Sequence, residues 1–225
     1  MNNNTHMFEN RVDAGRQLAA VLLEEFKNEP VVVLAIPNGG VPVAFEIASA
    51  LGKADLSLII SRKIPVPLNP EAGLGAVADD GTIFLDEETM GRFGLNRQQI
   101  EPEVNRVRAE LKARHILYYK DRPLASMVNK TAIIVDDGIA AGLTMRAAVA
   151  SVRHRRPAKV IAAVPVAAGN ALRQVAGLAD RVITCAVSEG PRFFIADFYR
   201  QWYDVNDDEV VRYLGRWQTW KLRRV

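Results

Sequence analysis

Several features that would point to particular classes of protein are scarce or missing in this 225-residue chain. A single cysteine, Cys185, cannot form a disulfide within the chain, which fits a reducing cytosol and leads us to expect a cytoplasmic protein. Cys185 lies in an apolar run and is predicted to be a small buried core residue. No apolar run approaches the roughly 20 residues that span a bilayer. The polar start, residues 1–7, lacks the apolar core of a signal peptide, and we expect it to be disordered.

Charge of one sign and clustered metal ligands are also lacking. The formal net charge is +3, with 49% hydrophobic and 24% charged residues, which is an ordinary soluble composition that does not by itself imply a nucleic-acid partner. His6, His115 and His154 have no ligand spacing with one another or with Cys185, which argues against a zinc site. The basic run at residues 153–156 ends a predicted helix, where a solvated face is favoured over a nucleic-acid patch. There is no internal repeat.

Short apolar runs rich in valine and isoleucine predict buried parallel strands. They lack alternation with polar residues, as expected when both faces of a sheet are covered, and occupy residues 31–36, 56–60, 132–135, 160–164 and 182–186. Helical patterns follow three of them, at residues 41–51, 143–152 and 170–176. This alternation predicts an α/β fold with a doubly wound, mainly parallel sheet in one domain over residues 1–225.

Residues 64–129 interrupt this rhythm as a long insertion. It starts in a stretch rich in proline and glycine, residues 65–75, that reads as a flexible loop, and it continues with a short strand at 82–85 and a charged helix at 98–118. A loop of this length predicts a lid over a site; a plain surface insertion is the alternative. The aromatic C-terminal part, residues 190–225, is predicted to form a hood or cap. Its aromatic side chains, in residues 193–203, would either stack on a planar ligand or pack in the core.

Residues 132–144 carry the strongest chemical signal. An apolar strand ends in Asp136 and Asp137 and turns through small residues into a helix. Parallel sheets bind ligands at this edge, small residues let backbone N–H groups approach a ligand, and a helix N-terminus attracts anions. The spacing suits a phosphate in the turn and sugar hydroxyls on the two carboxylates. The alternative is a helix cap or an ion site, such as the acidic pair of response-regulator receivers.

This segment resembles the signature of the type I phosphoribosyltransferases, in which four apolar residues, two acidic residues and a small-residue turn end in Gly-x-Thr. The resemblance covers the core from about residue 31 to residue 186. It implies that Asp136 and Asp137 bind the ribose hydroxyls of phosphoribosyl pyrophosphate. The 5-phosphate would lie on the turn made by Gly138, Ile139, Ala140, Ala141, Gly142 and Thr144.

Two alanines depart from the commonest form of this signature. Ala141 replaces a threonine, and orotate-type members share that change. Ala140 stands where members acting on 6-oxopurines carry an aspartate that assists proton transfer, so guanine and hypoxanthine are disfavoured as acceptors.

Two further segments fall where the family binds pyrophosphate. Pro37, Asn38, Gly39 and Gly40 follow the first predicted strand and form a loop with exposed amides. Arg62 and Lys63 follow the second strand. Taken alone, each segment also fits an ordinary turn or a solvated strand end.

The resemblance implies a Mg²⁺-dependent phosphoribosyltransferase with phosphoribosyl pyrophosphate and an unidentified nitrogenous acceptor as its partners. Asp136, Asp137, Arg62 and Lys63 would be its catalytic residues, and Mg²⁺ would be held mainly by substrate oxygens and water. The other hypothesis is a non-catalytic sensor of the same donor that regulates transcription or RNA. No nucleic-acid module and no membrane association are predicted, and a homodimer is the default assembly.

Overall fold

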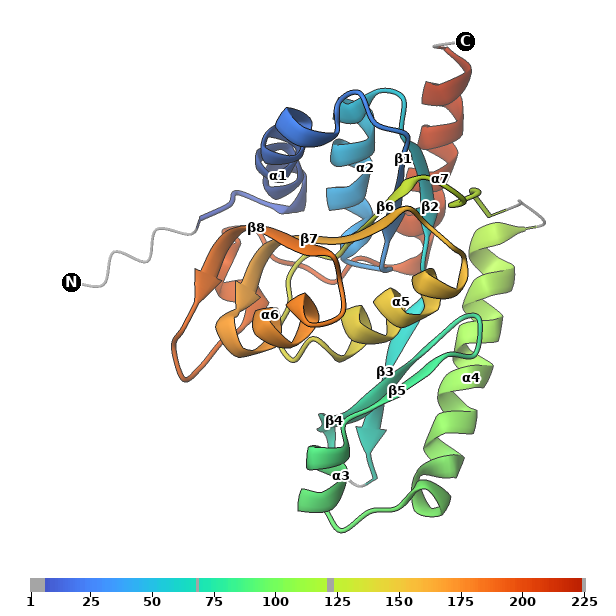
Figure 1. Ribbon diagram of the computed structural model, residues 1–225, viewed down its shortest axis with the longest axis vertical. Helices are drawn as coiled ribbons and strands as arrows, with labels where there is room; N and C mark the ends of the chain where they lie inside the picture. The colour runs from blue at the N-terminus through green and yellow to red at the C-terminus, as the bar shows by residue number, and fades with distance from the viewer. Residues whose placement is uncertain (1–6, 68, 121–123, 224–225) are drawn as a thin grey trace.

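The centre of the protein is a five-stranded parallel sheet. The computed structural model describes residues 7–67, 69–120 and 124–223. The strand order is β2 (Asp55–Leu58), β1 (Val31–Ala35), β6 (Thr131–Val135), β7 (Lys159–Ala168) and β8 (Arg181–Ser188), and every neighbouring pair is parallel. These are the five predicted strands, so the doubly wound α/β prediction is confirmed (Figure 1).

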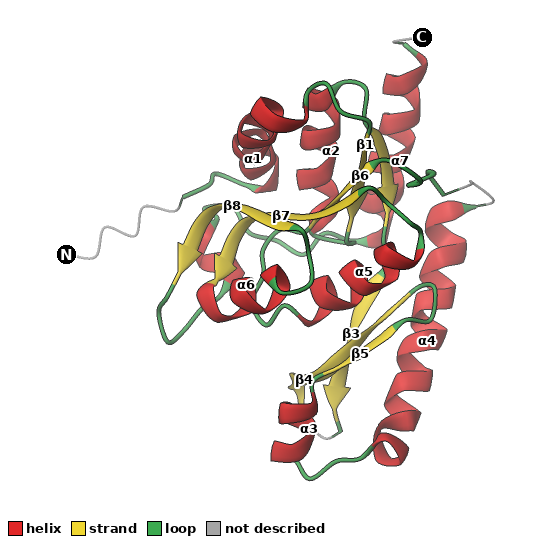
Figure 2. Cartoon of the chain, in the orientation of Figure 1, coloured by secondary structure: helices red, strands yellow, loops and turns green. Residues whose placement is uncertain are grey.

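Helices cover both faces of this sheet, which explains the unbroken apolar runs. Helices α1 (Arg11–Phe26) and α2 (Gly40–Leu51) lie on one face, and α5 (Leu143–His154) and α6 (Gly169–Ala176) lie on the other (Figure 2). Alternate residues of β1 enter two different cores. Val33 packs in the core of α1 and α2, whereas Leu34 packs in the core of α5 and α6. Each strand must therefore be apolar on both sides.

Most of the described part of the insertion forms helices and strands, and the prediction of a loop at residues 65–75 is wrong. Strands β3 (Ser61–Val66), β4 (Asn69–Ala78) and β5 (Ile83–Leu85) form a second, antiparallel sheet, followed by α3 (Glu87–Arg92) and α4 (Arg97–Tyr119). Pro65 is tolerated because the β3–β4 register shifts on both sides of it. Gly75 is required because a Cβ there would run into the Phe84 carbonyl of β5. Glycine serves close packing here rather than a turn.

Three helices have no counterpart in the predicted pattern: α1, α3 and α7 (Asp207–Leu222). A capping box starts α7, in which the side chains of Asn206 and Glu209 each accept the other's backbone N–H. The predicted cap, residues 190–225, thus contains the short helix η1 (Ile195–Phe198) and α7, which packs against α2 and α4. None of the described helices is long and apolar enough to cross a membrane.

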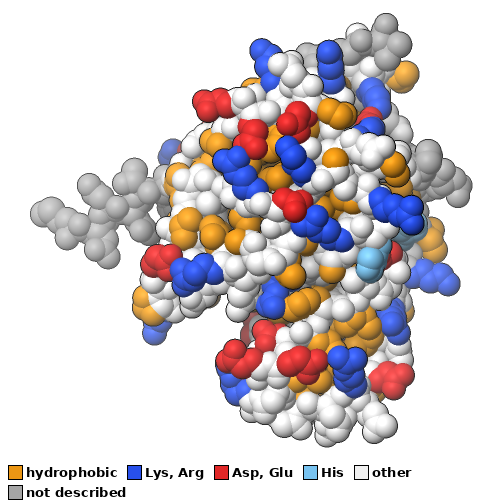
Figure 3. All heavy atoms as spheres, viewed as in Figure 1, with side chains coloured by type: hydrophobic (Ala, Val, Ile, Leu, Met, Phe, Trp, Pro, Cys, Tyr) orange, Lys and Arg blue, Asp and Glu red, His pale blue; other side chains and the backbone are white. Residues whose placement is uncertain are grey.

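Two local predictions need correction. Cys185 is only half-buried, because β8 is an edge strand; partial burial raises the pKa of its thiol. In the basic run, Arg155 is not a solvated side chain, since its Nη2 pairs at 3.1 Å with Asp79, whose side chain is 2% exposed. Of the predicted disordered start, residues 1–6 lie outside the described part and Met7 is exposed. Figure 3 shows cationic and anionic side chains interspersed on the visible face, without a broad basic surface.

The packing argument for Gly75 can be tested by adding a methyl group. Gly75→Ala is expected to lower the free energy of unfolding by about 1–3 kcal/mol, as overpacking does. Gly91→Ala in α3 is the control, because nothing lies within 4 Å of its added Cβ; it should leave stability unchanged or raise it by up to about 1 kcal/mol. Urea denaturation of both variants measures the difference. Equal stabilities would contradict the close approach of β4 and β5.

Candidate functional site

Two loops leave the same edge of the main sheet and touch each other. Because β1 and β6 are parallel neighbours with Ala35 opposite Val135, the chain after each strand emerges at the same place. The first loop, residues 36–40, lies against the second, residues 136–142: a Cβ on Gly39 would collide with the carboxylate of Asp137. A side chain at residue 39 would therefore force the two loops apart.

The second loop presents a row of unpaired backbone N–H groups. Its middle is pinned to β7, since the N–H of Ile139 donates to the Val166 carbonyl at 2.9 Å and the Ile139 carbonyl accepts from Ala168 at 2.8 Å. Gly142 then adopts a left-handed conformation (φ 75°) that starts α5. Among the described residues, no acceptor is bonded to the N–H groups of residues 140–145. The loop and the helix start together can hold an anion.

The two carboxylates that precede this loop are held differently. Asp136 accepts the N–H of Asp137 on its Oδ1 at 2.9 Å. Asp137 accepts the Nε–H of Arg11 on its Oδ2 at 2.8 Å, and its backbone carbonyl accepts the hydroxyl of Tyr199 at 2.6 Å. Arg11 comes from the first turn of α1 and its side chain is 6% exposed. A buried ion pair therefore lies directly behind the site.

Burial governs the protonation of this pair. Burial, followed by the negative charge of Asp137, raises the pKa of Asp136 well above its ordinary value. Burial also raises the pKa of Asp137, but the Arg11 guanidinium opposes that shift. Asp136 is thus the carboxyl that holds a proton more readily in the free protein.

Two hollows adjoin at the edge of the sheet. The first, about 300 Å³, is lined by residues 136–145 together with Lys63, Glu71, Gly73 and Ile195. The second, about 350 Å³, contains four basic side chains and is lined by Pro37, Ser61, Arg62, Lys63, Pro65, Pro70, Arg106, Val107, Glu110, Arg114 and Thr144. Lys63 and Thr144 border both. The structure thus brings residues 136–144 together with Pro37, Arg62 and Lys63.

Cations in the second hollow are already engaged. Arg62 pairs with Glu110 at 3.1 Å, and Glu110 also pairs with Arg106 at 2.8 Å. Lys63 donates to the carbonyls of Pro70 and Glu71 at 2.9 and 3.0 Å. These contacts are at least partly exposed, so their rearrangement around an incoming anion costs little.

The side chain of Asn38 is fully bonded within the protein. Its Nδ2 donates to the Val205 carbonyl and to Asp207, both at 2.9 Å. Its Oδ1 accepts from Arg114 at 3.1 Å and from Tyr118 at 3.0 Å. Asn38 therefore ties the first loop to α4 and α7. The backbone N–H groups of Asn38 and Gly39 donate no hydrogen bond within the described residues, and they are what this loop can offer to a ligand.

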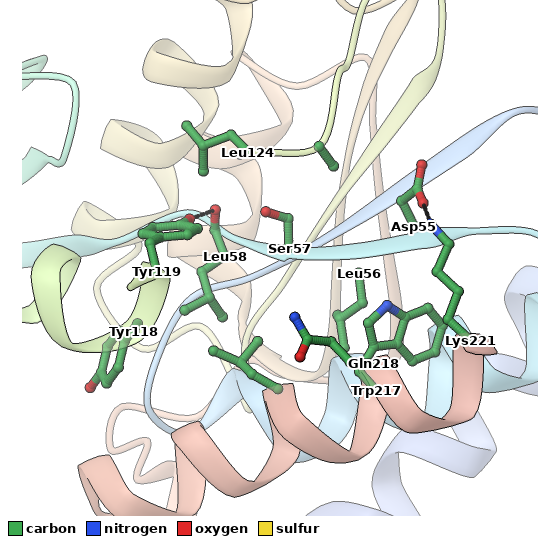
Figure 4. A pocket seen from close by; sticks show the side chains of 12 residues that line it. Asp55, Leu56, Ser57, Leu58, Tyr118, Tyr119, Leu124, Trp217, Gln218 and Lys221 are labelled. Atoms are coloured by element: carbon green, nitrogen blue, oxygen red, sulfur yellow. Dashed lines mark hydrogen bonds and ion pairs between the residues drawn. The ribbon is translucent and has the colours of Figure 1, made fainter. Parts of the chain in front are cut away.

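Another cavity, about 350 Å³, lies on the far side of Tyr118 (Figure 4). It is lined by the β2 edge, the end of α4 and the face of α7 that carries Trp217. Tyr119 closes one side by donating to the Leu58 carbonyl at 2.6 Å. This cavity contains neither of the two loops, so it is separate from the candidate site.

Sequence reasoning missed Arg11, Arg106 and Arg114. The last two occur at positions i and i+8 of the predicted helix at 98–118, with Glu110 midway, and this spacing places all three on one face. The sequence alone therefore indicates that these three side chains share one face of the helix, but it does not indicate that this face points toward the edge of the sheet. Arg11 gave no local signal, since its partner is 126 residues away. No three His, Cys, Asp or Glu side chains within the described ranges could by themselves hold a metal ion.

Known proteins similar to this chain agree with the fold. A family model, described as the phosphoribosyl transferase domain, matches residues 3–199. The Mycobacterium tuberculosis H37Rv protein Rv0571c, whose name places it among the phosphoribosyl transferases, is 37% identical over 210 residues. The match covers 93% of this chain and 47% of that protein, so the chain spans about half the length of this curated relative.

Solved structures agree with the same fold. TT1426 from Thermus thermophilus is 34% identical, with a TM-score of 0.76 over 93% of this chain and 98% of that one. AQ2163 from Aquifex aeolicus, 12% identical with a TM-score of 0.52 over 84% and 85%, shares the fold alone.

Opposite effects on stability are expected for the two carboxylates. Because the folded-state pKa of Asp136 is raised, its contribution to stability is full below the ordinary value of 3.8 and is lost as the pH rises through the raised value. Asp136→Asn should therefore stabilise the free protein at neutral pH, with a gain that shrinks on acidification. Urea unfolding at a series of pH values measures this; a pH-independent difference would contradict it.

Asp137→Asn should instead destabilise the protein by about 3 kcal/mol, because it leaves the buried Arg11 guanidinium without its counter-ion. The two variants differ by one position and by the same chemical change, so each controls for the other. A stabilising Asp137→Asn would show that the ion pair contributes nothing.

Proposed function

Because the chain belongs to the phosphoribosyl transferase domain family, we propose that it binds phosphoribosyl pyrophosphate across the two adjoining hollows. In this proposal the protein transfers the ribose 5-phosphate group to a nitrogenous base or a related nucleophile, and pyrophosphate is released. The observation that carries the proposal is the arrangement of the cleft. Free N–H groups and two carboxylates line one hollow, and four basic side chains line the hollow that adjoins it.

The 5-phosphate is assigned to the first hollow. The N–H groups of residues 140–145 and the Thr144 hydroxyl can all donate to its oxygens, and the positive end of α5 adds to the attraction. The ribose hydroxyls then fall on Asp136 and Asp137, which line the same hollow. Carboxylates accept hydrogen bonds from hydroxyl groups strongly.

The pyrophosphate is assigned to the second hollow, beside Arg62, Lys63, Arg106 and Arg114. As the bond to C1 of the ribose breaks, negative charge grows on the leaving pyrophosphate, and cations fixed there stabilise it. The N–H groups of Asn38 and Gly39 lie on the loop beside this hollow and can contribute in the same way.

Magnesium fits this donor set as an ion that arrives with the substrate. Three carboxylates line the first hollow, Asp136, Asp137 and Glu71, and Mg²⁺ commonly takes one or two carboxylates together with phosphate oxygens and water. Held mainly by substrate oxygens and water, it would neutralise charge on the pyrophosphate.

The acceptor would approach from the side of Ile195, whose side chain packs against Gly138. Ala140 is exposed at this edge and offers no group that could exchange a proton with a base. This supports an acceptor other than guanine or hypoxanthine. The β3–β4 hairpin borders both hollows through Lys63 and is the element suited to exclude water during transfer.

Turnover is tested by pyrophosphate release. The protein, Mg²⁺ and phosphoribosyl pyrophosphate are incubated with a panel of pyrimidines, purines and small amines, and pyrophosphate is measured. Release that depends on one acceptor class is expected. If phosphoribosyl pyrophosphate binds tightly but no acceptor of the panel gives pyrophosphate release, the transferase proposal is wrong. The protein would then be a sensor of phosphoribosyl pyrophosphate.

Donor placement is tested with Asp136→Asn. Replacing the carboxyl acceptor of a ribose hydroxyl by an amide is expected to weaken binding about 10- to 100-fold. Asp208→Asn, an exposed carboxylate in the first turn of α7, is the matched control and should bind as wild type does. Isothermal titration calorimetry measures both affinities. Unchanged affinity in Asp136→Asn would refute the ribose assignment.

A further inference from the structure

Arg11 is held on every side by groups behind the acidic pair. Besides its Nε bond to Asp137, its Nη1 donates to the Tyr203 carbonyl at 2.7 Å. The ring of Trp202 covers the guanidinium, with 3.8 Å between Cζ and the ring centroid. Such a cation–π contact stabilises a cation that has lost its water. With these contacts the side chain of Arg11 is only 6% exposed.

This arginine occupies only part of Asp137. The guanidinium takes Oδ2, and Asp137 also lines the first hollow, where a ligand can reach it. Asp136 is arranged in parallel, with Oδ1 taken by a backbone N–H. Each carboxylate is therefore fixed through one oxygen, which sets the direction of the other.

Charge gives Arg11 a second role. The groups that face Asp137 are Arg11 from α1, Asp136 beside it and the Tyr199 hydroxyl on its carbonyl. Of these three, Arg11 is the one that carries a positive charge, so it offsets the repulsion between the two adjacent carboxylates.

We propose that Arg11 is a positioning residue of the donor site: it fixes the Asp137 carboxylate through one oxygen and so sets the orientation in which the acidic pair receives the ribose hydroxyls. This inference rests on the proposed function. Trp202 and Tyr203 support it by enclosing the guanidinium.

Arg11→Met tests the role, with Arg16→Met as the matched control on the same helix. Arg16 is an exposed arginine that pairs with Glu46 at 3.1 Å, away from the acidic pair. Affinities for phosphoribosyl pyrophosphate and for pyrophosphate alone, which lacks ribose, are measured by calorimetry at neutral pH.

For Arg11→Met, donor affinity at neutral pH is expected to fall about tenfold or more. Pyrophosphate affinity should stay unchanged, and Arg16→Met should match wild type. Wild-type donor affinity in Arg11→Met, or an equal loss of pyrophosphate affinity, would overturn the proposal.

Arg11→Lys is measured as well, in case Arg11→Met does not fold. It keeps the positive charge, so its donor affinity should stay well above that of Arg11→Met, or remain measurable if Arg11→Met does not fold. Donor binding abolished in a folded Arg11→Lys protein would overturn the role of charge. Wild-type protein that binds neither phosphoribosyl pyrophosphate nor pyrophosphate would instead defeat the proposed function itself, which is a distinguishable result.

Discussion

A carboxylate buried at the edge of a sheet needs a counter-charge, and this requirement at Asp137 organises much of the protein. Its partner Arg11 recruits the start of α1, and the enclosure of Arg11 recruits the aromatic segment at residues 199–203. The same carboxylate lies against Gly39, so the first loop is positioned by the same contact. Elements from both ends of the chain thus meet behind the two loops. Their contacts position the loops and so determine the shape of the cleft in front of them.

The parts that the sequence predicted are those whose cause is local. A strand that is buried on both faces must be an unbroken apolar run, and such a run is visible in the sequence. The turn at residues 136–144 likewise requires small residues, which the sequence also shows. The ion pair of Arg11 has no such signature, because its partner is distant in sequence. The hairpin was misread for another reason. Proline and glycine usually mark turns. Here Pro65 lies where the register between β3 and β4 shifts, and Gly75 lies where β4 and β5 approach closely.

The second sheet makes the site a joint product of two layers. Lys63 on β3 borders both hollows, and α4 contributes Arg106 and Arg114 to the basic one. A parallel sheet alone would offer backbone donors and carboxylates at its edge. In the proposed reaction, the long insertion supplies the positive charge that the pyrophosphate leaving group requires. The site therefore depends on how firmly α4 is held against the main sheet, and the bonds of Arg114 and Tyr118 to Asn38 are part of that attachment.

The hydrogen bonds of Asn38 also affect how readily this asparagine deamidates. Asn38 is followed by Gly39, the sequence in which an asparagine amide is most open to attack by the next backbone nitrogen, with conversion to aspartate. Such a reaction would put a new negative charge next to Asp207 and on the loop that we propose lies beside the bound pyrophosphate. An amide whose nitrogen and oxygen are both fully bonded cannot readily turn toward that nitrogen. The network that anchors the loop thus also protects it from chemical decay.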